Sequence, residues 1–413
     1  MKNVKMHNDW ISDLHDSLLI HILSLLKTKQ AVQTCVLSKR WRNLWTYIPR
    51  RYFDFADFFS DDVDYDDIKE YDMKFERFVT AVLQKQDTPV LDSFKLVYDN
   101  RDGESNAITE WILCALNWKP RILDIYVDRY LMIDLPDLLF DCKSLEKMTL
   151  QFEGFVYYKP FKTGNLPSLK KLELSNWKID DYLINILMSG CPVLEDLTLS
   201  GCTVVTHIIS SNKLKHLFID DFYFRERITI SIPSLSSLVI HSEKGRISLM
   251  NMSSLVMARV MFFSYFTFPN PVHDILKGLS DVTNLEIILS GGIAKAILKH
   301  ELSNCATFKN LKSLHVDGYM IEDFHLIALF LQHTPNLEKL TLRHREPHPL
   351  PDVKPRTSKN FPMKITIKRK HLQLVEIIYE ANHERVYQLV KILHIYLKSI
   401  GKIYMHLEIP LAL

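Results

Sequence analysis

The sequence of 413 residues is poor in the features with which most enzymes bind phosphates, metals or reactive substrates. It has only 11 glycines, and neither G-x-G-x-x-G nor G-x-x-x-x-G-K-[ST] occurs. No H-E-x-x-H pair, C-x-x-C pair or G-x-S-x-G motif occurs either. The sequence therefore predicts no catalytic residues, no metal site and no cofactor.

Other absences bear on the compartment. The six cysteines lie far apart, which argues against a disulfide framework and fits a reducing compartment. The longest apolar run, Val260 to Phe268, is much shorter than the roughly 20 residues that span a bilayer. Asp9, Asp13 and Asp16, without a small-residue cleavage site, argue against a secretory signal. We expect an intracellular protein, cytoplasmic or nuclear, without membrane contact.

Charge is balanced overall but not locally. The formal net charge of +2 favours no nucleic-acid partner. Residues 1–51 carry nine Lys or Arg and three Asp, residues 52–72 carry one Lys and nine acids, and residues 343–371 carry nine Lys or Arg and two acids. Such blocks are typical of solvated loops or contact surfaces. We expect an acidic linker at 54–75 and an exposed basic, proline-rich loop at 343–359.

The first fifty residues indicate three short helices. Asp16, Thr28 and Ser38 are suitable N-caps, and apolar residues follow each at helical spacing. The first helix, Leu18 to Leu26, is apolar nearly all round, so it must be covered on more than one side. Three such short helices cannot cover it, which favours a partner protein over a plain terminal subdomain.

The segment from Asp9 to Pro49, which includes the run VLSKRWRNLW, closely resembles an F-box of the plant F-box/leucine-rich-repeat family. The resemblance implies binding to a Skp-type adaptor and, through it, to a cullin and a RING subunit. The family usually has Leu-Pro where this chain has Leu14–His15, so His15 either weakens docking or makes it sensitive to pH. The positions that map to the F-box core and adaptor-facing residues are Leu14, His15, Leu18, Leu19, Ile22, Leu23, Val32, Leu37, Trp41 and Leu44.

The pattern L-x-x-L-x-L, typical of a leucine-rich-repeat strand, recurs through the rest of the chain. Most leading leucines are separated by the 20–29 residues of that repeat class. The copies are Leu169–Leu172–Leu174, Leu194–Leu197–Leu199, Leu214–Leu217–Ile219, Leu235–Leu238–Ile240, Leu311–Leu314–Val316 and Leu337–Leu340–Leu342, with degenerate ones at Leu145–Met148–Leu150 and Leu285–Ile288.

Two units, starting at Leu169 and Leu311, match in detail: each has acids ten residues on, a helical stretch and then a proline. The repeat is therefore strand, loop, helix and turn, which stacks into a curved parallel sheet. Units of about 20 residues between Leu194 and Leu255 leave little room for a helix, and we expect irregular loops there.

The end of the chain, from about 361, resembles the family's C-terminal FBD extension in part. A strand over 371–377 and a helix over 384–400 are expected to cap the array. The predicted fold is α/β (α+β): an F-box at 8–53, the acidic linker at 54–75, a leucine-rich-repeat solenoid at 76–360 and the cap at 361–413.

On each repeat strand the leucines should point inward and the alternate residues toward the concave face. Mixed charge and histidine on that face suggest a polar peptide surface and not one for an anionic polymer. The candidate substrate-binding residues are Glu173, Thr198, His216, Phe218, Asp220, His241, His315, Asp317, Lys339 and Arg343.

Together with these features, the family resemblance implies a non-catalytic substrate receptor of a Skp–cullin–F-box ubiquitin ligase, with an unknown protein target. Two alternatives stay open: a binding protein that acts without degradation, and a small-molecule sensor. The sensor would need a pocket at the aromatic segment Val260 to Phe268, for which a buried strand is the simpler explanation.

Overall fold

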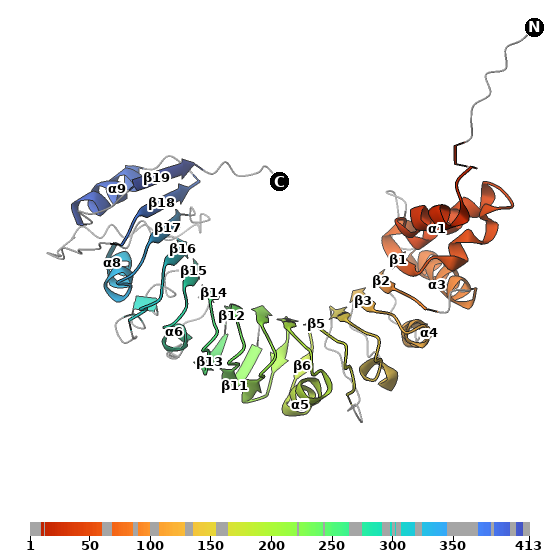
Figure 1. Ribbon diagram of the computed structural model, residues 1–413, viewed down its shortest axis with the longest axis horizontal. Helices are drawn as coiled ribbons and strands as arrows, with labels where there is room; N and C mark the ends of the chain where they lie inside the picture. Colours follow the sequence, from red (N-terminus) through yellow and green to blue (C-terminus); the bar gives the residue numbers. More distant parts are fainter. Residues whose placement is uncertain are drawn as a thin grey trace, which may run out of the picture. The chain divides into compact units, whose positions relative to one another are not determined.

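The computed structural model describes residues 10–11, 13–59, 68–85, 90–99, 107–128, 135–153, 164–220, 223–242, 244–263, 275–290, 298–299, 302, 307–318, 324–344, 371–380, 384–396 and 402–407. Its contacts divide the chain into two compact units: Met1–Lys178 with Asn185–Leu194, and Ile179–Ile184 with Glu195–Leu413. Short N-terminal helices precede a succession of parallel strands and helices (Figure 1). None of the helices in these ranges has the length and apolarity of a membrane span.

The three expected N-terminal helices are present. They are α1 (Asp16–Ser24), α2 (Thr28–Gln33), which continues into the 3₁₀ turn η1 (Thr34–Val36), and the 3₁₀ helix η2 (Trp41–Tyr47). The prediction that Asp16 caps α1 was wrong, because His15 is the N-cap and its Nδ1 accepts a hydrogen bond from the Ser17 N–H at 3.4 Å. Asp16 lies in the first turn instead, where its negative charge interacts favourably with the positive end of the helix dipole.

The first unit contains a parallel sheet with helices on one face. Its strands pair in sequence order, and along them inward apolar residues alternate with half-buried ones. Leu96, Ile125, Leu150 and Leu174 occupy the same register on successive strands and form one buried row. The elements are β1 (Arg50–Asp54), η3 (Phe55–Phe58), α3 (Ile68–Gln84), β2 (Ser93–Asp99), α4 (Ala107–Asn117), β3 (Ile122–Asp128), η5 (Asp137–Phe140), β4 (Lys147–Phe152) and β5 (Lys171–Ser175).

The sheet begins at β1, before residue 76, where the repeat array was predicted to start. The prediction of an acidic linker at 54–75 was wrong where the structure describes these residues. Residues 54–58 belong to β1 and η3, and residues 68–75 belong to α3. Buried Phe55 and Phe75 explain the difference: their rings meet edge to face with centroids 5.3 Å apart. Residues 60–67 lie outside the described residues.

The second unit contains parallel strands that again pair in sequence order, and the predicted leucine pattern is confirmed in them. One register was wrong: Leu285 pairs with Leu314 and points inward, so Ile288 faces the opposite side. The strands are β7 (Asp196–Ser200), β10 (His216–Asp220), β12 (Ser237–Ser242), β14 (Met257–Phe263), β15 (Asn284–Ser290), β16 (Ser313–Asp317), β17 (Lys339–His344), β18 (Leu374–Tyr379) and β19 (Lys402–Leu407).

Irregular loops were expected to connect the short repeats, but the connections are strands. β8 (Thr203–Val204), β9 (Ile208–Ser210) and β13 (Lys244–Met250) all pair with β11 (Tyr223–Ser231) in a second parallel sheet (Figure 1). An extended residue advances about 3.3 Å and a helical one 1.5 Å, so a connection of few residues returns along the repeat only if it is extended.

Three of the remaining helices lie where the sequence pattern predicted them: α5 (Asp181–Gly190), which follows the short strand β6 (Lys178–Ile179), α8 (Phe324–His333) and α9 (Glu384–Tyr396). The short helix α6 (Ile275–Gly278) was not predicted. The predicted strand-helix cap is incomplete, because β19 follows α9 and extends the sheet by pairing with β18. Residues 264–268 of the aromatic segment and 345–359 of the basic loop lie outside the described residues.

Candidate functional site

The helix α1 has one buried and one exposed apolar face. Leu19 and Leu23 are buried in a small core. Leu18 and Ile22, one position earlier in each turn, remain exposed to 51% and 43%. The following Leu25 is 69% exposed and continues this side at i+7. An amphipathic helix of a stable monomer does not usually present a row of leucines to water, so this face indicates a missing neighbour.

Further apolar side chains are exposed near the ends of α1 and α2. We call Leu18, Ile22, Leu25, Leu26, Val36 and Leu37 the exposed apolar set; each of them keeps at least 40% of its surface. Val36 and Leu37 lie at and just after η1, where the chain turns toward η2. A partner that covered this set would remove a large apolar surface from water.

The structure separates the ten predicted adaptor-binding residues into three groups. His15, Leu18, Ile22 and Leu37 are exposed, and Leu14 and Val32 are half-buried. The buried group is the core, Leu19, Leu23, Trp41 and Leu44. Only the first two groups are accessible to a partner, while the third holds the helices together. Leu25, Leu26 and Val36 are also exposed but were not among the predicted residues, although the lack of a polar side on the segment Leu18 to Leu26 already indicated the first two.

Arg40 holds the start of α1 against the turn before η2. Its Nη2 lies 2.6 Å from Asp16 Oδ1 and donates a hydrogen bond to the Leu14 carbonyl. His15, between these two partners, has a φ of −68°. A proline ring imposes nearly that angle, so the backbone here matches the Leu-Pro of the family pattern even though the side chain differs.

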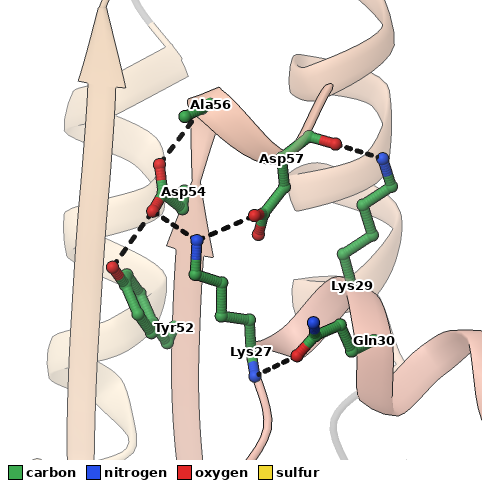
Figure 2. A network of polar contacts seen from close by, with 7 residues as sticks. All are labelled: Lys27, Lys29, Gln30, Tyr52, Asp54, Ala56 and Asp57. Atoms are coloured by element: carbon green, nitrogen blue, oxygen red, sulfur yellow. Dashed lines mark hydrogen bonds and ion pairs between the residues drawn. The ribbon is translucent and has the colours of Figure 1, made fainter. Parts of the chain in front are cut away.

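A polar network joins α2 to the first strand of the sheet (Figure 2). Lys27 Nζ lies 2.7 Å from Asp54 Oδ2 and 2.7 Å from Asp57 Oδ1. The Tyr52 hydroxyl donates to Asp54 Oδ2 at 3.0 Å, and Lys29 Nζ donates to the Asp57 carbonyl at 2.5 Å. The N-terminal helices are therefore held to β1 and η3 by charged contacts as well as by the chain itself.

The network shifts the ionisation of its members. Partial burial alone would raise the pKa of Asp54, but hydrogen bonds from Lys27, Tyr52 and the Ala56 N–H outweigh it and leave that pKa below the ordinary value. Burial lowers the pKa of Lys27 less than its hydrogen bonds to Asp54 and Asp57 raise it, so the net shift is upward. Both shifts favour the charged pair at neutral pH.

Arg51 occupies a position that apolar residues fill in the other repeats. It pairs in register with Phe94 of β2, and its side chain is buried. Its Nη1 donates to the Ile48 carbonyl at 2.7 Å and its Nη2 to the Thr46 carbonyl at 3.2 Å. Burial lowers the pKa of the Arg51 guanidinium to about 10, so it stays charged at neutral pH. Arg51 thus binds the carbonyl end of η2 to the sheet.

The second group of candidates lies on the open face of the sheet, by which we mean the side of the alternate, outward strand positions. In the second unit, pairing places Thr198 and Phe218 side by side, and likewise Asp220 and His241. His315 and Asp317 of β16 pair in the same way with Thr341 and Arg343 of β17, and Lys339 lies in the same strand. The nine candidates in this unit therefore form two clusters, one on β7 to β12 and one on β16 and β17.

The β16–β17 cluster is internally neutralised. Asp317 is buried, with Arg343 Nη1 3.9 Å from its Oδ2, so it supports Arg343 and does not face a target. Lys339 Nζ lies 2.8 Å from Glu376 Oε2 of β18. Burial lowers the pKa of His315 more than nearby carboxylates raise it, which keeps its ring neutral.

Glu173, the tenth candidate, lies on β5 in the first unit. Lys171 Nζ contacts its Oε1 at 2.8 Å, and the Thr149 hydroxyl donates to its Oε2 at 3.3 Å. In the described residues no three His, Cys, Asp or Glu side chains are arranged to hold a metal ion.

Comparison with known proteins identifies similar sequences for both regions. The F-box domain model matches residues 11–52, and the model of the LRR repeats of FBD-associated F-box protein At5g56370 matches residues 110–261. The chain is 32% identical over 365 residues to F-box/FBD/LRR-repeat protein At1g78750 of Arabidopsis thaliana, covering 81% of this chain and 77% of that protein. It is 31% identical over 366 residues to F-box/LRR-repeat protein 13 of the same plant, covering 81% and 76%.

Proposed function

Since the chain belongs to the plant family of F-box/FBD/LRR-repeat proteins, we propose that it is the substrate-recognition subunit of a Skp–cullin–F-box ubiquitin ligase. In this proposal the F-box binds a Skp-type adaptor, the open face of the repeats binds a target protein, and the chain itself catalyses no step. Linking the two binding sites raises the effective concentration of the target at the ligase.

The observation that carries the proposal is the exposed apolar set. A fully buried leucine gains about 1.5–3 kcal/mol relative to an exposed one, so each half-exposed member has about 1 kcal/mol left to gain in a partner. Six such side chains together contribute about 6 kcal/mol, which offsets the lower end of the roughly 4–15 kcal/mol cost of association, so polar contacts at the same interface must add to them. The buried core beneath them provides a rigid support for that interface.

Co-purification tests the proposal. The full chain is mixed with a plant Skp-type adaptor and a cullin, and we expect all three to elute together. Leu18→Asp should abolish this complex. Val90→Asp is the matched control, because Val90 is 52% exposed but lies outside the F-box. If the adaptor is retained without cullin, the protein acts without the ligase, and if neither is retained the proposal is wrong.

The target is sought by affinity enrichment and mass spectrometry with the proteasome blocked. Phe218 and Arg343 lie one in each open-face cluster. Substitution of both by Ala should abolish capture of the natural target while the adaptor stays bound. Unchanged capture by this double variant would refute binding at the open face.

A further inference from the structure

Three neighbouring strands of the second unit carry acids, histidines and one aromatic residue on their open face, and no fixed cation. Their sequences are DLTLS in β7, HLFID in β10 and SLVIHS in β12, and none contains Lys or Arg. We call Asp196, His216, Phe218, Asp220 and His241 the acid–aromatic patch. With its histidines neutral, the patch has a charge of −2 from two carboxylates.

Asp220 is held in place yet remains accessible. His241 Nδ1 lies 3.2 Å from Asp220 Oδ1, and because an ionised carboxylate only accepts, the ring nitrogen is the donor. The Gly201 N–H donates to the Asp220 backbone carbonyl at 2.9 Å. The side chain of Asp220 is still 42% exposed, so oxygen lone pairs are left for a ligand.

Phe218 lies in the middle of the patch, two residues before Asp220. Its register neighbours are Thr198 and Val239, both small, and its ring is half-buried. The ring of His241 meets it edge to face, with centroids 5.6 Å apart. A half-exposed phenyl ring beside a fixed carboxylate is a suitable environment for a cation, which is attracted by both.

Asp196 provides a second, separate carboxylate. The His216 Nε2 lies 3.9 Å from Asp196 Oδ1, and the Asp196 side chain is 38% exposed. His216 and Asp220 are four residues apart on β10, so Asp196 and Asp220 lie roughly 14 Å apart given strand rise and spacing. One cation cannot contact both carboxylates, but two basic side chains can.

On the strands from β15 to β18, each acid has a Lys or Arg of the same chain close to it. Glu286 on β15 lies 2.7 Å from Arg259, Glu376 lies 2.8 Å from Lys339, and Asp317 faces Arg343. There the chain supplies the cation for each acid. The strands β7, β10 and β12 contain no Lys or Arg for this role, so their carboxylates are open to a cation from another molecule.

We propose that the acid–aromatic patch binds a segment of the target protein that carries two basic residues, one over Phe218 against Asp220 and the other at Asp196. This inference rests on the proposed function, in which targets bind the open face. Arginine fits better than lysine, because its planar guanidinium stacks on the ring and donates two hydrogen bonds to one carboxylate.

The test uses the full chain bound to its Skp-type adaptor and three fluorescent 12-residue peptides in a Gly-Ser background. One contains two arginines four positions apart, one contains two glutamates in their place, and one is neutral. Fluorescence anisotropy should show the arginine peptide binding at least about tenfold more tightly than the glutamate peptide, with an affinity that falls as salt is added.

Variants locate the binding. Asp220→Asn should weaken the arginine peptide about tenfold, and Phe218→Leu about threefold. Glu376→Gln is the control, since the Glu376 carboxylate already has Lys339, and it should leave binding unchanged. Equal affinity for all peptides, or an unchanged affinity in Asp220→Asn, overturns the inference. Adaptor binding is measured in the same samples, so its loss would instead count against the proposed function.

Discussion

Leu172 and Leu174 of the strand β5 are completely buried, whereas Leu18 and Leu25 near α1 keep 51% and 69% of their surface. Both pairs belong to the first unit, and both lie in leucine-rich segments. The strand leucines are covered because the chain itself supplies the neighbouring strands and the helices beneath them. The α1 leucines are covered on one side, where α1 contacts η2, and Leu18 and Leu25 remain exposed.

The difference teaches that a repeat array provides its own neighbours, while the F-box helix leaves apolar side chains exposed, which in the proposed function another protein covers. Leucines of the first kind should therefore determine stability, and leucines of the second kind should determine affinity.

The largest effect is expected in the repeat. Leu172→Ala leaves a cavity in a fully buried row and should lower the free energy of unfolding by about 2–5 kcal/mol. Leu25→Ala removes an exposed side chain and should change it by less than about 0.5 kcal/mol. Chemical denaturation of both variants measures the free energy of unfolding. An equal loss in the two variants would contradict the distinction between buried repeat leucines and exposed F-box leucines.

The distinction between residues that determine stability and residues that determine affinity should also hold for two neighbouring residues of α1. Ile22→Ala should weaken adaptor binding by about 1–2 kcal/mol, or roughly tenfold, with an unchanged melting temperature. Leu23→Ala, which alters the next residue but a buried one, should lower the melting temperature first. Calorimetric titration with the adaptor and thermal melts together check the pair. A melting temperature that falls equally in both would show that the exposed face is structural.

The joint between the two regions depends on Arg51. Arg51→Met keeps the length of the side chain but removes the donors to the Ile48 and Thr46 carbonyls, which costs about 1–3 kcal/mol of stability. Arg51→Lys should recover part of the loss, since it keeps the charge and one donor. Denaturation midpoints measure the series, and a fully stable Met variant would contradict the role assigned to Arg51.

The Lys27–Asp54 pair should make this joint sensitive to acid. The pKa of Asp54 is below its ordinary value in the folded state, so the unfolded state binds more protons as acid is added. The stabilisation is complete above the ordinary carboxyl pKa of about 3.9 and is lost as the pH falls through the lower folded value. Wild type should therefore lose more stability than Asp54→Asn below about pH 4. Parallel acid dependence would contradict this.

The smallest change is expected from His15→Pro. The φ of −68° accommodates the ring, but proline removes the 3.4 Å cap hydrogen bond from the Ser17 N–H, so stability should fall by no more than about 1 kcal/mol. If His15 weakens docking, the proline variant should bind the adaptor about threefold more tightly in a titration at neutral pH. Weaker binding would show that His15 itself makes a contact.

Much of the fold follows from local sequence periodicity. The leucines of β5, β7, β10 and β12 were predicted in the correct register because apolar residues alternate there with polar ones. β1 and β2 were missed since Arg51 and Phe94 replace the expected leucines at the same inward position. The inward Arg51 is stable only because η2 supplies carbonyl acceptors, which is tertiary information that no local pattern contains.

The candidate sites were predictable to different degrees. That the helix from Leu18 to Leu26 lacks a polar side could be inferred from sequence, but which leucines are buried depends on how α2 and η2 pack. On the open face, alternation indicated Asp220 and Asp317 equally. Only the contacts distinguish them, because Asp317 is buried with Arg343 while Asp220 remains accessible.

Hydrogen–deuterium exchange of the full chain, with and without a Skp-type adaptor, tests the central claim most directly. We expect the adaptor to slow exchange in peptides that cover residues 16–37 and to leave peptides that cover β5 unchanged, because only the former surface is incomplete in the free chain. Unchanged exchange over residues 16–37 at saturating adaptor would contradict the account.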